Sequence, residues 1–204
     1  MPSRSGTVFL LAATLATAAC DKQSPAPEQA NVAATAPATP DEVTPDEVVS
    51  DSKAAAPTSG AVDRTHKGEA APALAFADPA GKKVTLADFR GQPVLLNLWA
   101  TWCAPCIKEM PSLDAAAAGA GDRVRVVAVS QDMQREKVAP FFAERKLTHL
   151  APYTDADMGL SLHYRVNLPT TIMFDAEGRE LWRVSGALDW NGAAAKALIA
   201  EATL

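Results

Sequence analysis

The chain has 204 residues, 48% of them hydrophobic, which is enough for one domain with a full apolar core and additional segments. Its formal net charge is −5, and the acidic excess lies in the N-terminal part: residues 1–70 carry 5 Lys/Arg and 9 Asp/Glu, whereas residues 71–204 carry 14 and 15. The C-terminal part is therefore nearly neutral, so no basic face that would bind a nucleic acid is indicated.

Residues 1–20 are predicted to be a secretory signal peptide. Arg4 and the N-terminal amine form a short positive region, and an apolar run from Val8 to Ala19 follows it. That run is too short to span a membrane as a helix, but it has the length of a signal-peptide core. We therefore expect export to a compartment that permits disulfides.

Cys20, at the end of this segment, follows small residues, an arrangement that resembles the bacterial lipoprotein signal. The resemblance implies lipidation of Cys20, and Asp21 resembles the residue that retains lipoproteins in the inner membrane. Acyl chains would supply membrane affinity. Thr17 departs from the usual signal, so cleavage near Ala18 by the ordinary signal peptidase is the alternative.

Residues 21–70 are rich in Ala, Pro, Ser, Thr, Asp and Glu and contain no aromatic residue. Such a segment cannot bury enough apolar surface to offset the entropy of ordering. Its prolines and like charges favour an extended chain. We interpret it as a disordered linker that holds the following domain away from a membrane; a segment without a role is the alternative.

From residue 71 onward the pattern predicts alternating strands and helices. A hairpin is expected where the sequence KVTL at 83–86 follows the turn residues 78–81. Strands are expected at 94–100, 124–130, 170–175 and 180–185, and helices at 104–118 (kinked by Pro111), 135–146, 157–164 and a last segment capped by Asn191 and ending at Ala202. This order predicts an α/β domain over 71–204, with a central mixed sheet flanked by helices and an additional N-terminal β-hairpin.

Two cysteines, Cys103 and Cys106, lie in the sequence NLWATWCAPCIKEMP at 97–111. A closed zinc site requires four ligands, and no second closely spaced Cys or His pair exists. A disulfide between them would close so short a loop that it would add little stability. We therefore predict neither a metal site nor a purely structural disulfide.

The position of the pair favours redox chemistry. It follows a buried strand and begins a helix, where unpaired N–H groups stabilise a thiolate. Cys103 comes first and is expected to be exposed and nucleophilic. Cys106 lies one helical turn further on and can resolve a mixed disulfide.

Three motifs of the chain resemble those of a known family. WCAPC at 102–106, VVAVS at 126–130 and YRVNLPTTIMFDAEGRE at 164–180 resemble the TlpA/ResA/CcmG group of periplasmic thiol-disulfide oxidoreductases, over residues 71–204. The resemblance implies a thioredoxin fold of the redoxin type. It also implies that no cofactor is needed beyond the Cys103–Cys106 disulfide.

The same resemblance assigns roles around the cysteines. Pro169 is expected to be cis and to pack against the pair, with the backbone of Leu168 exposed to a bound substrate strand; an ordinary trans proline is the alternative. Trp102, Ala104 and Pro105 are expected to line the rim of the substrate site. Trp99 is expected to lie in the core.

Glu109 is the predicted proton carrier. General thioredoxins have a buried Asp six residues before the first cysteine, where this chain has Asn97. Glu109 lies three residues after Cys106, on the same helix face. The matching Glu in ResA-like proteins is a functional acid, and burial would raise its pKa towards neutrality. A solvated surface Glu is the alternative.

The leading hypothesis is therefore a membrane-tethered periplasmic disulfide reductase. There are three alternatives to it. A copper chaperone would use both cysteines and Met110, since thiolates and thioethers bind Cu(I). A thiol oxidase or isomerase would use the same fold. A peroxidase would require the pattern Pro-x-x-x-Thr-x-x-Cys, which is absent because Ala100 precedes Cys103 by three residues.

The resemblance implies partners of three kinds. Clients would be proteins with cysteine pairs, either apocytochrome c before haem attachment or copper-assembly proteins. A membrane thiol-disulfide protein would supply electrons, because the periplasm is kept oxidising. A lipid anchor would hold the protein at the inner membrane. The self-sufficient domain suggests a monomer.

Overall fold

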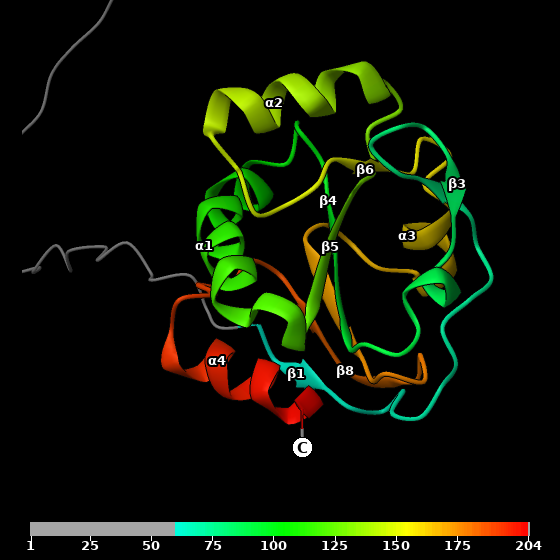
Figure 1. Cartoon of the computed structure of the whole chain (residues 1–204), viewed down its shortest axis with the longest axis vertical. Helices are drawn as coiled ribbons and strands as arrows, with labels where there is room; N and C mark the ends of the chain where they lie inside the picture. Colours follow the sequence, from blue (N-terminus) through cyan, green and yellow to red (C-terminus); the bar gives the residue numbers. More distant parts are fainter. Residues whose placement is uncertain (1–59, 204) are drawn as a thin grey trace, which may run out of the picture. The chain divides into compact units, whose positions relative to one another are not determined.

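The computed structural model describes residues 60–203, and the expectations for the signal peptide, for Cys20 and for most of the linker lie outside this range. The described residues form one mixed sheet with the strand order β1-β8-β7-β4-β5-β6-β2-β3 (Figure 1). Its strands are β1 (Val62–Asp63), β2 (Phe76–Ala77), β3 (Lys83–Val84), β4 (Val94–Trp99), β5 (Arg125–Ser130), β6 (Tyr153–Thr154), β7 (Thr170–Phe174) and β8 (Glu180–Ser185).

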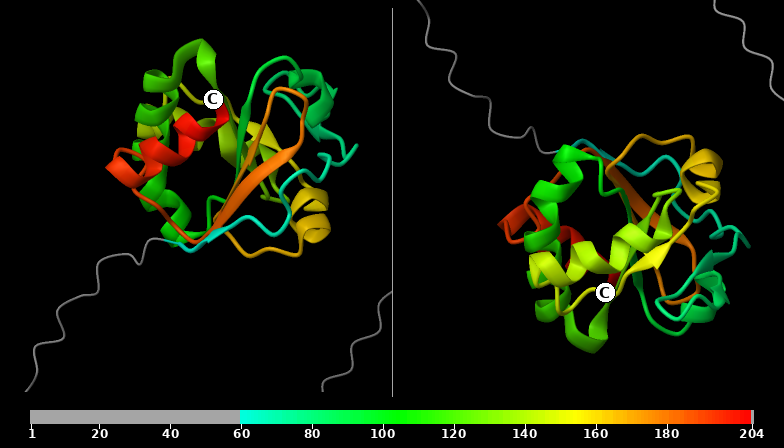
Figure 2. Two further views of the ribbon diagram at one scale, coloured as in Figure 1. Left: turned by 90° about the horizontal axis from the view of Figure 1, so that it is seen from below. Right: turned by 90° about the horizontal axis from the view of Figure 1, so that it is seen from above.

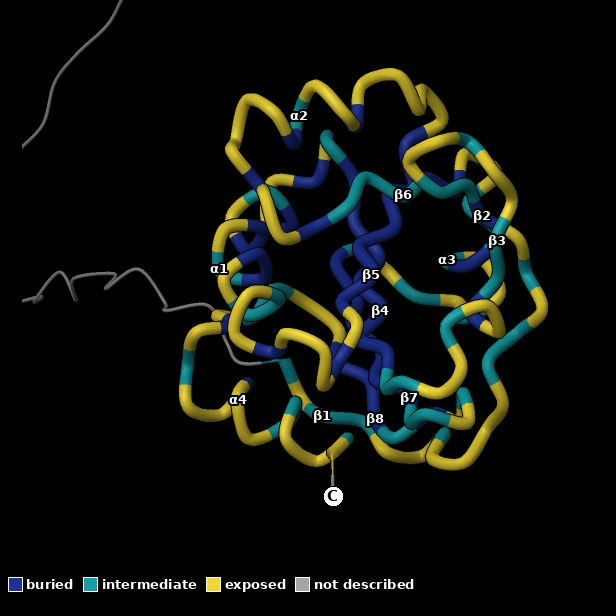
Figure 3. The backbone as a smooth tube through the Cα atoms, in the orientation of Figure 1, coloured by how far each residue is buried: buried dark blue, intermediate teal, exposed yellow. Residues whose placement is uncertain are grey.

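The centre of the sheet is made by β4, β5 and β7. β4 is parallel to β5, with Trp99 opposite Ser130, and antiparallel to β7, with Asn97 opposite Thr171. All six residues of β4 are buried, which explains why its sequence is a continuous apolar run interrupted only by Asn97 (Figure 3). A strand covered on both faces requires apolar side chains on both faces, so this run specifies the central position.

Helices cover both faces of the sheet. The helices are α1 (Ala104–Ala120), α2 (Val138–Arg145), α3 (Gly159–Tyr164) and α4 (Ala193–Ala200), with short 3-10 segments at Leu86–Phe89, Gly121–Arg123, Arg135–Lys137 and Glu201–Thr203. α1, α2 and α4 contribute to one apolar cluster, which includes Leu113, Phe142 and Ala195. α3 contributes Leu160 to a second cluster on the other face (Figure 2). The predicted thioredoxin-like α/β fold is confirmed.

α1 carries the redox pair at its first turn. Cys103 is the N-cap residue, and its sulfur accepts a hydrogen bond from the backbone N–H of Cys106 at 3.3 Å. Pro105 stands in the first turn, where a missing N–H costs nothing. Pro111 lies inside the helix, as the sequence predicts. The helix ends before Gly121, whose φ of +53° is accessible to glycine.

The predicted hairpin is present but shorter than expected. Phe76 pairs with Val84 and Ala77 with Lys83, in antiparallel register. Residues after Val84 leave the strand because Thr85 begins a 3-10 turn through a capping box with Asp88. The side chain of Asp88 accepts the Thr85 backbone N–H, so these residues bond locally instead of extending the ladder.

The folded sheet begins before Ala71, so the expected linker boundary at residue 70 is wrong. Val62 pairs with Val184 and Asp63 with Arg183 at the edge of the sheet, and Ala70 bridges Arg179. These pairs are made by the backbone and need little apolar side chain, so hydrophobic periodicity does not reveal them. The predicted cap of the last helix also differs: Gly192 is the N-cap residue instead of Asn191.

Within residues 60–203, no helix combines the length and the apolar character that crossing a membrane requires.

Candidate active site

The Cys103–Cys106 pair forms a disulfide at the C-terminal end of β4, where the chain turns into α1. The two Cα atoms are 5.2 Å apart. Cys106 is fully buried and Cys103 is only 6% exposed, so the expectation of an exposed Cys103 is wrong for the disulfide form. Cys103 nevertheless has exposed neighbours at Trp102, Ala104 and Pro105, which border the disulfide on the surface, where the sequence predicts a rim.

Trp102 is 66% exposed, an unusual state for so large an apolar side chain. Trp99, three residues earlier, is fully buried and packs against Phe141 and Phe142, so its predicted core position is confirmed. Trp182 and Trp190 are buried as well. Of the four tryptophans, Trp102 is thus the one whose side chain a binding protein can reach.

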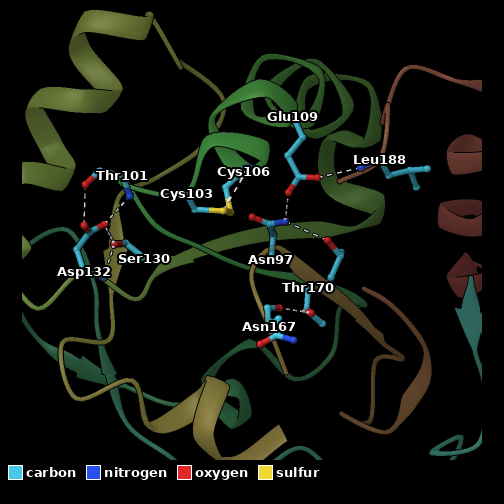
Figure 4. Close-up of a disulfide and its surroundings, with 11 residues drawn as sticks. Asn97, Thr101, Cys103, Cys106, Glu109, Ser130, Asp132, Asn167, Thr170 and Leu188 are labelled. Atoms are coloured by element: carbon cyan, nitrogen blue, oxygen red, sulfur yellow. Dashed lines mark hydrogen bonds between the residues drawn. A yellow bond between two sulfur atoms is a disulfide. The ribbon is translucent and has the colours of Figure 1, made fainter. Parts of the chain in front are cut away.

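Glu109 is 3% exposed and lies on the inner side of α1 (Figure 4). Its Oε1 accepts a hydrogen bond of 2.8 Å from Asn97 Nδ2 on β4. Its Oε2 accepts one of 3.1 Å from the backbone N–H of Leu188, which lies 79 residues later in the loop between β8 and α4. The predicted burial is confirmed, and the alternative of a solvated surface Glu is wrong.

Burial raises the pKa of Glu109 to about 7, because the charged carboxylate loses solvation. The hydrogen bonds from Asn97 and Leu188 act in the opposite direction, since they stabilise the charged form. No cation within the described site neutralises the carboxylate, so burial outweighs the hydrogen bonds. A carboxyl group with this pKa can both accept and give a proton near neutral pH.

Asn97 and Thr171 connect Glu109 to the centre of the sheet. Asn97 Nδ2 also donates to Thr171 Oγ1 at 3.0 Å, while the buried Asn97 Oδ1 has no protein partner. An amide offers a donor and an acceptor, and a hydroxyl can act as either. Rotating the Asn97 amide would present Oδ1 to a protonated Glu109, and Thr171 could then donate to the amide. With Thr171 as its partner, Asn97 can therefore hydrogen-bond to Glu109 in either protonation state of the carboxyl group.

The sequence does not reveal Thr171 or Leu188 as members of this site. Thr171 reads as an ordinary strand residue, and Leu188 takes part through its backbone alone. Thr171 is identified as a site residue by the register of β4 against β7, which places it opposite Asn97. The role of Leu188 depends on the conformation of its loop, and its side chain does not predict that conformation.

The Leu168–Pro169 peptide bond is cis, as the family resemblance implies. Pro169 directly precedes β7, whose Thr170 pairs with Leu98 of the strand that leads to the cysteines. Thr170 Oγ1 donates to the carbonyl of Asn167 at 2.6 Å, which holds the turn closed (Figure 4). Leu168 packs against both apolar clusters. The structure thus brings this turn to the same end of the sheet as the disulfide.

A second polar network, absent from the sequence-based expectations, lies on the other side of the disulfide (Figure 4). The buried carboxylate of Asp132 accepts hydrogen bonds from the Thr101 backbone N–H (2.8 Å) and hydroxyl (2.6 Å) and from the Ser130 hydroxyl (2.6 Å). Thr101 belongs to the turn that carries Cys103, and Asp132 to the segment after β5. These bonds fix the two segments to each other.

Two further features bear on the alternatives. Met110, which the copper hypothesis would place beside the cysteines, is fully buried in the same apolar cluster as both of them. A cavity of about 420 Å³ lies between α1 and α4, and its lining includes Trp190, Lys196 and Ile199. None of the residues that the sequence assigns to the site lines this cavity.

Comparison with known proteins agrees with this geometry. The chain is 35% identical over 116 residues to the thioredoxin-like protein YneN of Bacillus subtilis, covering 55% of this chain and 67% of the relative. It is 32% identical over 124 residues to the thiol-disulfide oxidoreductase ResA of the same organism, covering 60% and 69%.

Solved structures show the same architecture. A DsbE-type thiol:disulfide interchange protein from Chlorobium tepidum aligns with a TM-score of 0.59 and 28% identity, over 68% of this chain and 98% of that protein. The exposed lipoprotein thioredoxin Etrx1 of Streptococcus pneumoniae aligns with a TM-score of 0.55 and 25% identity, over 63% and 98%.

The model of the Redoxin family matches residues 66–199, which contain the disulfide, Glu109 and the cis proline. The sequence relatives, the shared fold and the cysteine pair at the start of α1 all agree with this match. The chain belongs to the Redoxin family and is a thiol-disulfide oxidoreductase of the ResA/DsbE type.

Proposed function

We propose that this protein is a membrane-tethered periplasmic reductase that reduces disulfides in client proteins. The observation that carries the proposal is the buried Glu109, with a pKa of about 7, on the same helix as the Cys103–Cys106 pair. A pair that passes electrons to a client must lose the proton of its resolving thiol. Glu109 is a buried acceptor suited to that proton.

The reaction uses two thiol-disulfide exchange steps. The Cys103 thiolate attacks one sulfur of the client disulfide, forms a mixed disulfide and releases the first client sulfur as a thiolate. Cys106 passes its proton to Glu109 and attacks Cys103 Sγ, which forms the Cys103–Cys106 disulfide and releases the second client sulfur. Two electrons move from the protein to the client, and the two client thiolates take up protons.

The first step has structural support at the helix terminus. Cys103 is the N-cap of α1, and the Cys106 backbone N–H already donates to its sulfur in the disulfide form. An N-terminal helix end stabilises negative charge through its unpaired N–H groups. The same arrangement would stabilise the Cys103 thiolate once the pair is reduced.

The client would lie across the exposed rim of the disulfide. Trp102, Ala104 and Pro105 would contact its side chains, and the backbone of Leu168 beside Pro169 would pair with an extended client segment. Clients would be apocytochrome c or copper-assembly proteins that carry cysteine pairs. The protein would act as a monomer and would need no cofactor apart from its own disulfide.

The pair must be reduced again after each turnover, and a membrane dithiol protein would supply the two electrons. The signal-like residues 1–20 and the lipoprotein-like Cys20 support anchoring at the inner membrane. The lipoprotein Etrx1, which shares the fold, provides a precedent for such an anchor. Mass spectrometry of the mature protein tests it: diacylglycerol on Cys20 is expected, and an unmodified N-terminus elsewhere would reject it.

The reduction potential of the Cys103–Cys106 pair tests the direction of electron flow. The full chain would be equilibrated in dithiothreitol and glutathione buffers and the thiol fraction measured. A potential below about −200 mV is expected for a donor, within the range of about −270 to −120 mV that related proteins cover. A potential near −120 mV would instead assign the protein as a thiol oxidase.

A further inference from the structure

The loop between β8 and α4 is fastened to the redox site through alternate backbone N–H groups. Gly186 donates to the carbonyl of the cis proline at 2.8 Å, and Leu188 donates to Glu109 Oε2 at 3.1 Å. Trp190 then donates to Ser112 Oγ at 3.2 Å. The loop is therefore bonded at one end to the turn before β7 and along its length to α1, beside the buried carboxyl.

The Leu188 N–H is the donor to Glu109 that cannot change its role (Figure 4). A backbone N–H only donates, whereas the side-chain amide of Asn97 can present either its nitrogen or its oxygen. Burial raises the pKa of Glu109, and the hydrogen bonds from Asn97 and Leu188 act against burial because they stabilise the charged form. The position of the loop therefore sets part of the acidity of Glu109.

Ser112 connects α1 to this loop through its hydroxyl. Ser112 Oγ donates to the backbone carbonyl of Glu109 at 2.8 Å, so the hydroxyl proton is used within the helix. The oxygen is left to accept the Trp190 N–H from the loop. Leu188 thus lies between two anchors, at Gly186 and at Trp190. The first anchor joins two backbone groups, and the second depends on the Ser112 side chain.

Apart from burial, the groups that act on the pKa of Glu109 are neutral. They are the Asn97 amide from β4 and, from the loop, the Leu188 N–H and the indole of Trp190. The buried Nε1 of Trp190 has no hydrogen-bond partner among the described residues, yet the indole also lowers the pKa of Glu109. Cys106, one turn earlier on α1, titrates only when the disulfide is reduced. In the oxidised protein, the titration of Glu109 therefore reports on its hydrogen bonds.

We propose that Ser112 is a positioning residue for the proton chemistry of Glu109, because its hydroxyl holds the loop so that the Leu188 N–H stays on Oε2. The inference rests on the proposed function, in which Glu109 takes the proton of Cys106. The Leu188 N–H still requires an acceptor after that transfer, so the proton belongs on Oε1, which faces the rotatable Asn97 amide. Ser112 thereby also selects the oxygen of Glu109 that carries the proton.

The titration of the Glu109 carboxyl in the oxidised full chain tests this proposal. Carbon-13 NMR of the side-chain carboxyl groups would follow the wild type and Ser112→Ala, with Glu109→Gln identifying the signal. Alanine is a strong helix former, so α1 should persist. Weakening the Leu188 bond is expected to make Glu109 about three- to tenfold weaker as an acid and to move its titration to higher pH. An unchanged titration, with or without a lower melting temperature, would overturn the proposal.

Two variants serve as matched controls. Ser112→Thr keeps the hydroxyl and should titrate as the wild type does. Ser161→Ala removes a bond of the same kind, since Ser161 Oγ donates to the Met158 carbonyl at 3.1 Å, but it does so on α3, at the other face of the sheet (Figure 2). It should leave the titration of Glu109 unchanged. A shift in either control equal to that of Ser112→Ala would overturn the assignment.

Amide hydrogen exchange measures the effect of Ser112 on the loop directly. In oxidised Ser112→Ala, the Leu188 amide is expected to exchange about tenfold faster than in the wild type, the loss expected from one hydrogen bond. The Gly186 amide should keep its rate, because its bond is made between backbone groups. An unchanged rate at Leu188 would show that the Ser112 hydroxyl does not hold the loop, and the proposal would fail.

The pH profile of kcat separates this inference from the proposed function. With the reduced full chain and a disulfide peptide, the inflection expected near pH 7 should move to higher pH in Ser112→Ala, together with the carboxyl titration. A titration that moves while the kcat profile stays would support the role of Ser112 and reject Glu109 as the proton carrier. Failure of the wild type to reduce the peptide would reject the client reductase, and the titration would still decide the role of Ser112.

Discussion

Asn97 and Glu109 are joined by a buried hydrogen bond of 2.8 Å, from the side-chain amide on the central strand to the carboxyl on the helix that carries the cysteines. The amide occupies the sequence position at which general thioredoxins place a buried carboxylate. The carboxyl group is thus supplied by α1 in this chain, and the strand supplies a neutral partner that can donate to it or accept from it.

Replacing Glu109 by Gln should slow disulfide exchange without altering the fold, because Gln keeps the shape and an acceptor oxygen. We expect a loss of kcat of about 100-fold at pH 7, the lower end of the usual contribution of a positioned proton acceptor. The pH profile of the wild type should show an inflection near pH 7 that the variant lacks. Glu144→Gln, a change on the exposed side of α2, is the control and should behave as the wild type. A wild-type profile in Glu109→Gln would exclude the proton-carrier role.

The stability of the oxidised protein should fall as pH rises between about 4.5 and 7. The pKa of Glu109 is raised from 4.5 to about 7 in the folded state, so the folded protein binds this proton more tightly than the unfolded chain does. Stability from this group is fully present below pH 4.5 and is lost as pH rises through 7. The shift corresponds to about 3 kcal/mol.

Urea unfolding of the wild type and of Glu109→Gln across this pH range measures that contribution. The difference in unfolding free energy between the two proteins should change by about 3 kcal/mol from pH 4.5 to pH 8. Using the difference removes the contributions of other titrating groups, which the two proteins share. A difference that does not depend on pH would show that folding does not raise the pKa of Glu109.

Asn97→Asp should place two carboxyl groups within hydrogen-bond distance in a buried site. Two such groups cannot both ionise without a large penalty, so the pair should retain one proton well above pH 7. We expect the variant to lose about 3 kcal/mol of stability at pH 8.5, the cost of breaking a buried polar contact and leaving a charge unpaired, and much less at pH 5. Asn97→Ala, which removes the amide without adding charge, is the control. Equal losses at both pH values for Asn97→Asp would contradict the prediction.

The two cysteines should differ in what they do to a client. Cys106→Ser should trap a mixed disulfide between Cys103 and the client, because the resolving thiol is missing. Cys103→Ser should form no such adduct, since Cys106 is fully buried. Intact-mass measurement after mixing the variants with a disulfide peptide distinguishes the outcomes. Stable adducts on Cys106 in the second variant would reverse the assigned roles.

Some parts of the site could be predicted from local sequence alone. The apolar run of β4, the Cys-x-x-Cys spacing and the following helix are all short-range features, and they place the pair at a strand-to-helix turn. The cis state of Pro169 is expected only because the surrounding motif resembles the family. The β1 strand could not be predicted, since two residues that pair through their backbone leave no periodic signal.

Contacts distant in sequence could not be predicted in the same way. The Leu188 N–H reaches Glu109 across 79 residues, and the Thr101–Asp132 bonds span 31. Neither contact depends on a pattern within its own segment. Each forms because the parallel pairing of β4 with β5, or the packing of the loop between β8 and α4 onto α1, brings polar groups together in a buried place where they must be paired.

The sequence by itself determined the fold class, the identity of the redox pair and the candidacy of Glu109, because strand burial, helix starts and motif spacing are encoded over a few neighbouring residues. Only the tertiary structure decided that Glu109 is buried, that its pKa reaches about 7, and that Cys103 is nearly covered in the disulfide form. Solvation and strand register depend on every element packed around a residue, and that information is spread over the whole chain.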